Sequence, residues 1–211
     1  MAGRVLTIAQ QKGGSGKTTL AINLSVHFAA QGQRVALLDT DPQGSLGRWF
    51  MTRRERTDGE AGLEFGTASA WGVSYECEKL RRDHDLVVID TPPKIDADLR
   101  PALREANLVL IPVATSQVDL WAIDSLSDLM RREHRDALVV MNRVPPRARL
   151  TAEITRDIDA SGLDRAAATL GNRVSYAEAM GRGLGAAELS RSGRAAQEVA
   201  ALCEEVAARL D

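Results

Sequence analysis

Residues 11–19 read Gln11-Lys12-Gly13-Gly14-Ser15-Gly16-Lys17-Thr18-Thr19, with an apolar run at 5–9 before them and a helix-forming run at 20–26 after them. A strand, a glycine-rich loop and a helix start, in that order, are typical of a phosphate-binding loop. The glycines let the backbone curl so that successive N–H groups point at an anion, and the helix start adds unpaired donors and a positive dipole end. In such a loop Lys17 contacts the β- and γ-phosphates and the Thr18 hydroxyl binds Mg²⁺.

The first position of this loop is irregular. The usual pattern is G-x-x-x-x-G-K-[ST], and counting back from Gly16 places Gln11 where a glycine is expected. Lys12 adds a second lysine at the start of the loop. The sequence therefore predicts a variant phosphate-binding loop.

The composition excludes several classes of protein. A length of 211 residues, with 44% hydrophobic and 27% charged residues, is ordinary for a globular α/β domain. The net charge of −2 excludes a polycation, so any nucleic-acid binding needs a local basic face. Cys77 and Cys203 are far apart and outside any C-x-x-C pattern, which argues against a disulfide scaffold, a zinc site or an iron–sulfur cluster. With no signal peptide and no apolar stretch of roughly 20 residues, we expect a cytoplasmic protein.

Apolar runs that are too short for helices alternate with helical patterns along the chain. We predict buried strands at 4–10, 34–39, 85–90, 107–113 and 137–142, a short strand at 63–67 and a poor strand candidate at 166–170. The predicted helices span 17–31, 45–56, 72–83, 96–106, 118–134, 151–160, 175–181 and 191–210. This alternation predicts an α/β fold of the P-loop NTPase type, in which a mostly parallel twisted sheet has helices on both faces. We expect a single domain over residues 1–211.

Aspartates follow two of the predicted strands. Asp39 and Asp41 come after the second strand, and Asp90 ends the strand at 85–90. Any one of them alone is explained by the tendency of Asp to begin turns. Because ligands of open parallel sheets bind at the carboxyl ends of the strands, we expect all three to lie beside the phosphate-binding loop.

These segments together resemble the deviant Walker A ATPases of the ParA/MinD family. The similarity lies in Lys12 to Thr19, in Leu38 to Gly44, and in the Val87 to Pro93 segment that resembles a Walker B region. The runs Leu110-Ile111-Pro112-Val113 and Met141-Asn142-Arg143 also match. The greatest similarity is to small ParA-like partition proteins, and we expect no N-terminal DNA-binding domain.

The resemblance implies an ATP- and Mg²⁺-dependent ATPase that forms a face-to-face homodimer on ATP. Lys12 would reach across to the phosphates bound by the other subunit, Lys17 would act within its own subunit, and Asp41 would position the attacking water. Asp90 would hold Mg²⁺ through water, with Thr18 as a ligand and Asp39 nearby. The implied nucleotide contacts are Lys12, Gly13, Gly14, Ser15, Gly16, Lys17, Thr18, Thr19, Asn142 for the adenine, and Arg143 beside it.

The resemblance also implies binding to non-specific DNA, association with the nucleoid in the ATP state, and a ParB-like or other adaptor protein that stimulates hydrolysis. Phosphate contacts need arginines or lysines on one face, and residues 141–194 contain nine Arg against six acidic residues. Our candidates for DNA binding lie in predicted loops or near glycines: Arg147, Arg149, Arg173, Arg182, Arg191 and Arg194.

Two other functions remain open at this point. A MinD-like protein would bind membranes through a basic amphipathic C-terminal helix, but the charges of residues 195–211 are net acidic, so we interpret their apolar stripe as core packing and expect no membrane partner. An ATP-dependent cofactor-synthesis enzyme could share the fold, and it would need a small substrate. Contact with a partner protein is one explanation for Trp49, Trp71 and Trp121, but we interpret each of them as buried.

Overall fold

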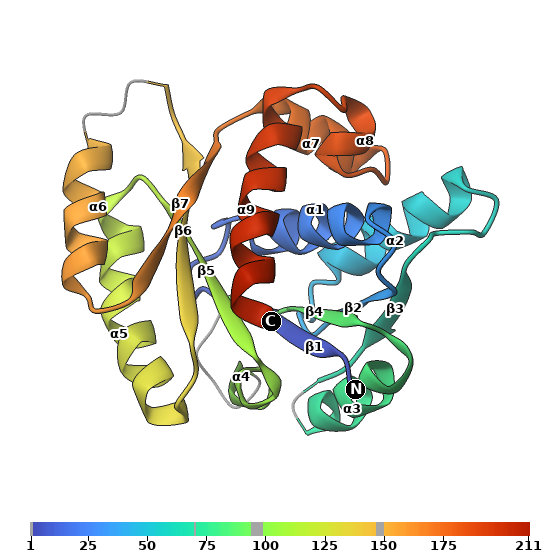
Figure 1. Ribbon diagram of the computed structural model, residues 1–211, viewed down its shortest axis with the longest axis horizontal. Helices are drawn as coiled ribbons and strands as arrows, with labels where there is room; N and C mark the ends of the chain where they lie inside the picture. Colours follow the sequence, from blue (N-terminus) through green and yellow to red (C-terminus); the bar gives the residue numbers. More distant parts are fainter. Residues whose placement is uncertain (1, 70, 94–98, 147–149) are drawn as a thin grey trace.

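The computed structural model describes residues 2–69, 71–93, 99–146 and 150–211, with the backbone alone at 117–122 and 150. A seven-stranded sheet forms its centre (Figure 1), and every pairing in it is parallel. Its order is β3-β2-β4-β1-β5-β6-β7. The strands are β1 (Arg4–Ile8), β2 (Val35–Asp39), β3 (Glu64–Thr67), β4 (Leu86–Asp90), β5 (Leu108–Ala114), β6 (Ala137–Val144) and β7 (Asp164–Gly171).

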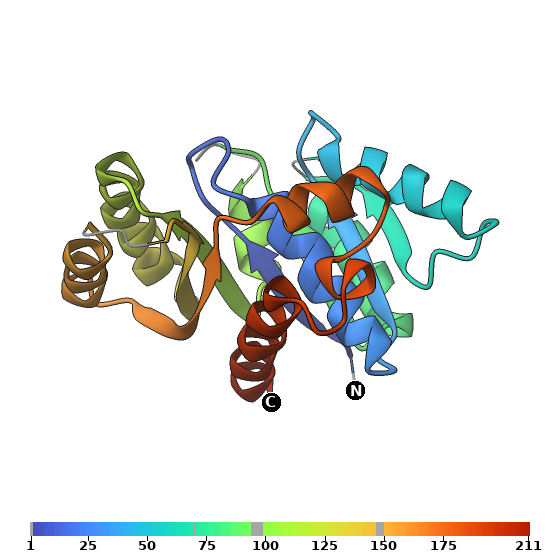
Figure 2. The ribbon, with the colours of Figure 1, turned by 90° about the horizontal axis from the view of Figure 1, so that it is seen from above.

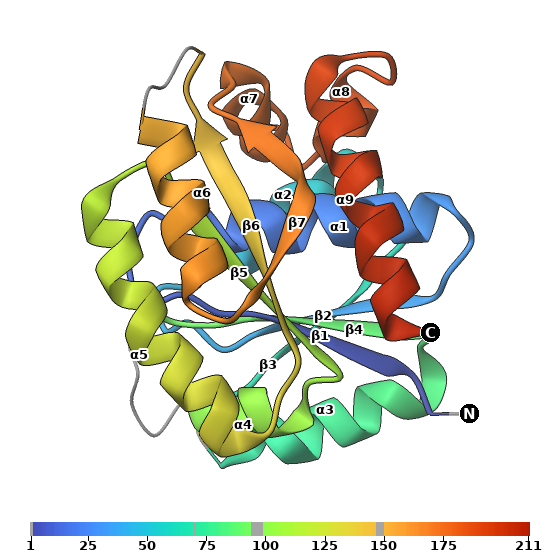
Figure 3. The same ribbon diagram turned by 60° about the vertical axis from the view of Figure 1, so that its left-hand side comes forward.

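Helices cover both faces of this sheet, as Figure 3 shows. One face carries α1 (Lys17–Ala30), α2 (Ser45–Arg56), α7 (Val174–Gly181), α8 (Ala186–Leu189) and α9 (Arg194–Leu210). The other carries α3 (Gly72–Asp83), α4 (Leu99–Glu105), α5 (Gln117–Glu133) and α6 (Leu150–Ala160). The predicted α/β fold with helices on both faces is therefore confirmed.

The central strands are buried on both sides, which explains their unbroken apolar runs. In β1, Leu6 and Ile8 belong to the core under α1 and α9, whereas Val5 belongs to the core under α3 and α4. All five residues of β2 and of β4 are buried. Strands buried on both faces lose the apolar–polar alternation of half-exposed ones.

The edge strand β7 is longer and better formed than the poor candidate at 166–170 suggested. Its alanines have low strand propensity, and its pairing with β6 contains register shifts. Two glutamates of α9 support it from the side. Glu205 accepts the backbone N–H groups of Ala167 and Ala168, at 2.9 and 2.6 Å, and Glu198 accepts that of Gly171 at 3.1 Å. Side-chain acceptors thus replace the missing neighbouring strand.

The C-terminal helices differ in detail from the prediction. The helix predicted at 191–210 begins at Arg194, and the short α8 was not predicted at all. The apolar stripe of α9 is buried, as we interpreted it: Val199, Leu202, Val206 and Leu210. The two chain ends lie on the same side of the molecule (Figure 2), where Arg4 Nη2 donates to the Asp211 carbonyl at 3.1 Å.

Of the three tryptophans, Trp49 is buried with 3% exposure, as expected, whereas Trp71 is 89% exposed and its interpretation as a core residue was wrong. Trp71 immediately precedes α3, whose buried face is formed by Val73, Cys77 and Leu80. The side chain of Trp121 lies outside the described residues. Cys77 and Cys203 are both buried and free. Among the described residues, no helix is long and apolar enough to cross a membrane.

Candidate nucleotide-binding site

Three strands end side by side at one edge of the sheet. In the register, Ile8 of β1 lies beside Asp90 of β4, and Asp90 lies beside Asp39 of β2. The phosphate-binding loop follows β1 and leads into α1. The prediction that the loop and the two aspartate segments share one edge is therefore confirmed. We call residues 10–19, 39–45 and 90–91 the nucleotide edge.

The loop is held in a conformation that only glycine tolerates at its last turn. Gly16 has a φ of +94°, and a Cβ atom there would lie 2.3 Å from Asn142 Nδ2. The amide of Asn142 donates to the carbonyl of Ser15 at 2.8 Å. The end of β6 thus fixes the shape of the loop through a side chain that is 5% exposed.

Lys17 points beneath the loop. Its Nζ donates to the Gln10 carbonyl at 3.0 Å and lies 3.5 Å from the Lys12 carbonyl. Burial lowers the pKa of Lys17, and the nearby carboxylates of Asp90 and Asp41 act in the opposite direction. Because phosphate oxygens are stronger partners for an ammonium group than carbonyl oxygens, Lys17 can exchange these contacts for a phosphate.

Thr18 of the loop and Asp90 at the end of β4 form a second polar contact at this site. The Thr18 hydroxyl donates to Asp90 Oδ2 at 2.6 Å, while Asp90 Oδ1 is buried and has no hydrogen-bond partner among the described residues. Burial raises the pKa of Asp90 to about 7. A buried carboxylate oxygen that accepts no hydrogen bond lies here beside a threonine hydroxyl. Oxygen ligands of these two kinds fit Mg²⁺.

The described residues contain no cluster of three or more His, Cys, Asp or Glu side chains that could hold a metal ion. Mg²⁺ retains water and commonly binds one or two carboxylates together with substrate phosphates. The nucleotide edge therefore suits an ion that arrives with a phosphate chain, and it does not resemble an all-protein metal cage.

The two aspartates after β2 have different surroundings. Both oxygens of Asp39 accept backbone N–H groups, from Asp41 at 3.0 Å and from Gly47 at 3.1 Å, so its carboxylate organises the loop. Burial raises the pKa of Asp39, and these two hydrogen bonds oppose the rise. Asp41 is half-buried, and its Oδ1 accepts the N–H of Gln43 at 2.9 Å.

Two adjoining cavities open at the nucleotide edge. The first, of about 260 Å³, is lined by residues of the loop together with Asp41, Gln43, Ser45 and Arg143. The second, of about 250 Å³, extends towards α7. Thr19, Arg143 and Met180 line both. A phosphate chain over the loop and a nucleoside beyond it would occupy adjoining spaces of this kind.

A family model described as the CobQ/CobB/MinD/ParA nucleotide binding domain matches residues 6–186. The chain belongs to this family. It is 30% identical over 208 residues to maintenance of carboxysome distribution protein A from Halothiobacillus neapolitanus, and the match covers 95% of each chain. It is 36% identical over 170 residues to the chromosome partitioning protein ParA of Caulobacter vibrioides, with 63% of this chain and 62% of that protein covered.

Solved structures of the family share the fold. The cell division ATPase MinD of Pyrococcus furiosus superposes with a TM-score of 0.80 at 19% identity, over 98% of this chain and 99% of that one. An ATP complex of a Cyanothece McdA variant gives a TM-score of 0.79 at 17% identity, over 99% and 96% of the two chains. Because the sequence identities are below 20%, these two superpositions show a shared fold and nothing more specific.

Within this ParA/MinD framework, the structure adds detail on Asn142 and Lys12. The side chain of Asn142 is engaged by Ser15 and by the N–H of Arg143, which donates to its Oδ1 at 2.9 Å. Arg143 itself is exposed, with a φ of +53°. Lys12 Nζ donates to Ser116 Oγ of its own chain at 3.2 Å. The adenine contact of Asn142 and the cross-subunit role of Lys12 stay predictions.

The six arginines predicted to bind DNA fall into three groups. Arg147 and Arg149 lie outside the described residues. Arg173 is partly buried, and its Nε donates to both carboxylate oxygens of Glu198 at 3.0 Å, so its charge is already partnered. The other three, Arg182, Arg191 and Arg194, are exposed around α7, α8 and α9.

Sequence reasoning missed two residues of this site. Gln10 is 1% exposed; its amide donates to the Pro112 carbonyl at 3.1 Å and its side-chain oxygen accepts the Gln11 N–H at 2.8 Å, which braces the loop's start. Met180 of α7 lines both cavities, and its sulfur accepts the Thr19 hydroxyl at 3.1 Å. A methionine 161 positions along the chain from Thr19 carries no sequence signal for this contact.

Proposed function

We propose that this ParA/MinD-family chain is a Mg²⁺-dependent ATPase, with residues 1–211 forming one ATPase domain, that dimerises on ATP and positions a cargo along non-specific DNA. The observation that carries the proposal is the arrangement of Lys17, Thr18 and Asp90 under a loop that also bears Lys12. The full-length similarity to a carboxysome distribution protein and the partial similarity to a chromosome partitioning protein support a positioning role.

The phosphates of ATP lie in the cradle of backbone N–H groups from Gly13 to Thr19. Lys17 leaves the carbonyls of Gln10 and Lys12 and binds the β- and γ-phosphates. Thr18 and Asp90 would hold Mg²⁺, which would supply positive charge that offsets the phosphate charge. The buried Oδ1 of Asp90, which has no hydrogen-bond partner among the described residues, would be satisfied in this arrangement.

Hydrolysis depends on placing a water molecule. Asp41 is half-buried at the rim of the loop cavity, which allows its carboxylate to orient the attacking water. Positioning and charge neutralisation supply most of the catalysis in phosphoryl transfer. We expect slow turnover until an adaptor protein of ParB-like function completes the site.

The dimer joins two such edges. Lys12 exchanges its contact with Ser116 for a phosphate bound by the second subunit. The exposed arginines near α8, Arg182, Arg191 and Arg194, then bind DNA phosphates without reading sequence. The cargo is a DNA locus, a plasmid or a protein assembly.

No observation favours the membrane alternative. The large apolar residues of α9 are buried in the core that it shares with α1 and the sheet, so they are not available to a bilayer. The cofactor-synthesis alternative predicts ATPase activity that needs a small substrate and ignores DNA.

The test uses the full chain with Mg²⁺ and either ATP or ADP. Analytical ultracentrifugation should show a dimer with ATP and a monomer with ADP. Fluorescence anisotropy should show binding to DNA of unrelated sequences, and the affinity should fall steeply with salt because counterions are released. A chain that forms no ATP-dependent dimer and shows no salt-sensitive DNA binding would overturn the proposal.

A further inference from the structure

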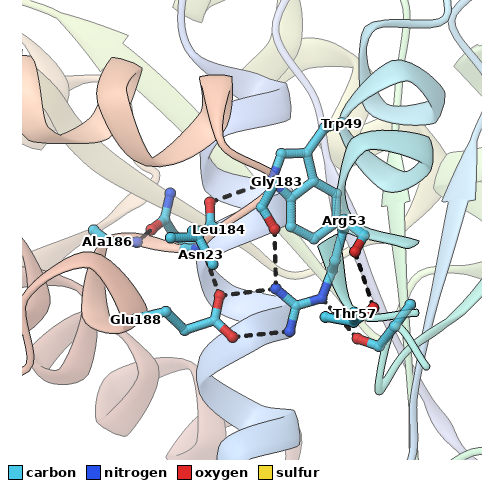
Figure 4. Close-up of polar contacts among 10 residues, drawn as sticks. Asn23, Trp49, Arg53, Thr57, Gly183, Leu184, Ala186 and Glu188 are labelled. Atoms are coloured by element: carbon cyan, nitrogen blue, oxygen red, sulfur yellow. Dashed lines mark hydrogen bonds and ion pairs between the residues drawn. The ribbon is translucent and has the colours of Figure 1, made fainter. Parts of the chain in front are cut away.

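A buried arginine joins α2 to α8. Arg53 is 9% exposed, and its Nη1 and Nη2 each donate to one carboxylate oxygen of Glu188 at 2.8 Å (Figure 4). Its Nε donates to the Ala61 carbonyl at 2.6 Å and its Nη1 also donates to the Gly183 carbonyl at 3.1 Å. Every nitrogen of this guanidinium is therefore used within the protein.

The contact between α2 and the turn before α8 is tight. Gly183 has a φ of +67°, and a Cβ atom there would lie 2.5 Å from the backbone nitrogen of Arg53. The indole Nε1 of Trp49 donates to the Leu184 carbonyl at 3.2 Å, and the Arg53 guanidinium lies 5.5 Å from the centre of the Trp49 ring. A displacement of α2 must therefore displace this turn.

A second connection joins the same short helix to α1. The Asn23 side chain donates to the Thr19 carbonyl at 2.7 Å and accepts the N–H of Ala186 at 2.8 Å. Asn23 is 3% exposed. The first residue of α8 is thus tied to the turn of α1 that follows the phosphate-binding loop.

Both helices begin at the nucleotide edge. Helix α1 starts at Lys17, and α2 starts at Ser45, directly after the loop that carries Asp41. Residues 174–189, which we call the α7–α8 bridge, contact both helices through the two connections above. Figure 4 shows Asn23 of α1 and Arg53 of α2 converging on this bridge from different elements.

We propose that the α7–α8 bridge is a relay from the nucleotide site to the DNA-binding surface. When the Asp41 loop moves relative to the phosphate-binding loop on exchange of ADP for ATP, the Arg53–Glu188 and Asn23–Ala186 contacts carry that motion into α7 and α8. The output is the position of Arg182 and Arg191, exposed residues beside α7 and α8. This inference rests on the proposed function and adds its route of regulation.

The physical basis is the rigidity of the two connections. Packed elements shift between discrete arrangements and do not deform continuously. Arg53 is buried, whereas the Glu188 side chain is 32% exposed. Two parallel hydrogen bonds between planar groups fix their relative orientation, so this bidentate pair is suited to fixing geometry.

The experiment measures amide hydrogen exchange by NMR at Leu184 and Ala186 in the full chain, with Mg²⁺ plus ADP and with Mg²⁺ plus a non-hydrolysable ATP analogue. We expect the exchange rates to differ between the two nucleotides by about fivefold or more in the wild type, because ordering of the bridge changes its local opening equilibrium. Glu188→Gln should keep nucleotide affinity and reduce that difference to less than about twofold. Glu78→Gln is the matched control, since its ion pair with Arg82 is exposed and lies on α3.

Glu188→Asp, which keeps the charge but shortens the side chain, replaces Glu188→Gln if that variant does not fold, and it should give the same loss. The relay is overturned if both nucleotides bind and leave the exchange rates at the bridge equal in the wild type. It is also overturned if the folded Glu188 variant keeps the full difference. Failure of the wild type to bind either nucleotide would overturn the proposed function itself.

Discussion

The nucleotide edge and the α7–α8 bridge use buried charge in opposite ways. At the edge, Asp90 Oδ1 has no hydrogen-bond partner among the described residues, and Lys17 is held by carbonyl groups. At the bridge, the guanidinium of Arg53 from α2 donates to the Glu188 carboxylate and the Gly183 carbonyl of the bridge, and also to the Ala61 carbonyl. An incompletely paired buried charge is costly and is relieved by a ligand. The nucleotide edge is therefore suited to binding a ligand, whereas the contacts of the bridge hold α1 and α2 in place.

The largest expected effect concerns ATP binding at the nucleotide edge. Lys17→Ala should weaken ATP binding about 1,000-fold, or about 4 kcal/mol, because loss of a buried charged partner costs about 2–5 kcal/mol. Isothermal titration calorimetry with Mg²⁺–ATP measures it. The control is Lys79→Ala, since Lys79 is an exposed lysine paired with Glu76. Equal affinities for ATP in the two variants would show that Lys17 does not contribute to ATP binding.

Asp41 is the next position to test. Asp41→Ala should reduce ATP turnover about 100-fold, at the lower end for loss of a residue that handles the reacting proton or water, while ATP binding persists. The variant should therefore remain a dimer after ATP is added. Sedimentation and phosphate release are measured together. Normal phosphate release would contradict the role of Asp41, and a monomer with bound ATP would show that the dimer depends on it.

Lys12 separates binding from dimerisation. Lys12→Ala should leave ATP affinity within about threefold and weaken the ATP dimer about 30-fold, or about 2 kcal/mol, the size of a charge-assisted hydrogen bond. The dimer dissociation constant is obtained by sedimentation over a range of protein concentrations. Lys79→Ala, at an exposed lysine on α3, is the control. A dimer as tight as the wild type would contradict the cross-subunit role.

The two regions also differ in how far sequence reasoning reaches them. The nucleotide edge follows from contiguous motifs, since the spacing of Gly16, Lys17 and Thr18 and the strand-ending position of Asp90 are visible in the chain itself. The bridge depends on contacts such as Arg53 with Glu188, 135 residues apart. Many distant carboxylates could satisfy one arginine, so no spacing rule selects Glu188. The same limit applies to Met180 against Thr19 and to Glu205 supporting β7.

Exposure of a single side chain was equally hard to predict. Trp71 was interpreted as buried because large aromatic residues usually pack inside. It immediately precedes α3, whose buried face is formed by three smaller residues, Val73, Cys77 and Leu80. The sequence between β3 and α3 contains no distinctive turn motif that would indicate which side of the first turn faces the sheet. The pattern of α3 predicts a helix but not the orientation of its first turn.

The smallest expected effect concerns the stability of the bridge. The carboxylate of Glu188 is partly desolvated, which raises its pKa, but hydrogen bonds from Arg53 and from the Gly185 N–H outweigh this and leave the pKa of Glu188 below its ordinary 4.5. A lowered folded-state pKa contributes stability that is present above the ordinary value and is lost as the pH falls through the folded value.

Glu188→Gln should therefore lower the free energy of unfolding by about 1.5 kcal/mol at pH 7, less than the roughly 3–5 kcal/mol of a fully buried pair, because the Glu188 side chain is 32% exposed. The difference from the wild type should shrink as the pH falls below 4.5. Urea unfolding at pH 7 and at successively lower pH measures both, and Glu78→Gln at an exposed pair should cost less than about 0.5 kcal/mol. A destabilisation that is equal for the two variants would mean that the bridge is no more rigidly held than the surface, and the contrast between the two regions would rest on the nucleotide edge alone.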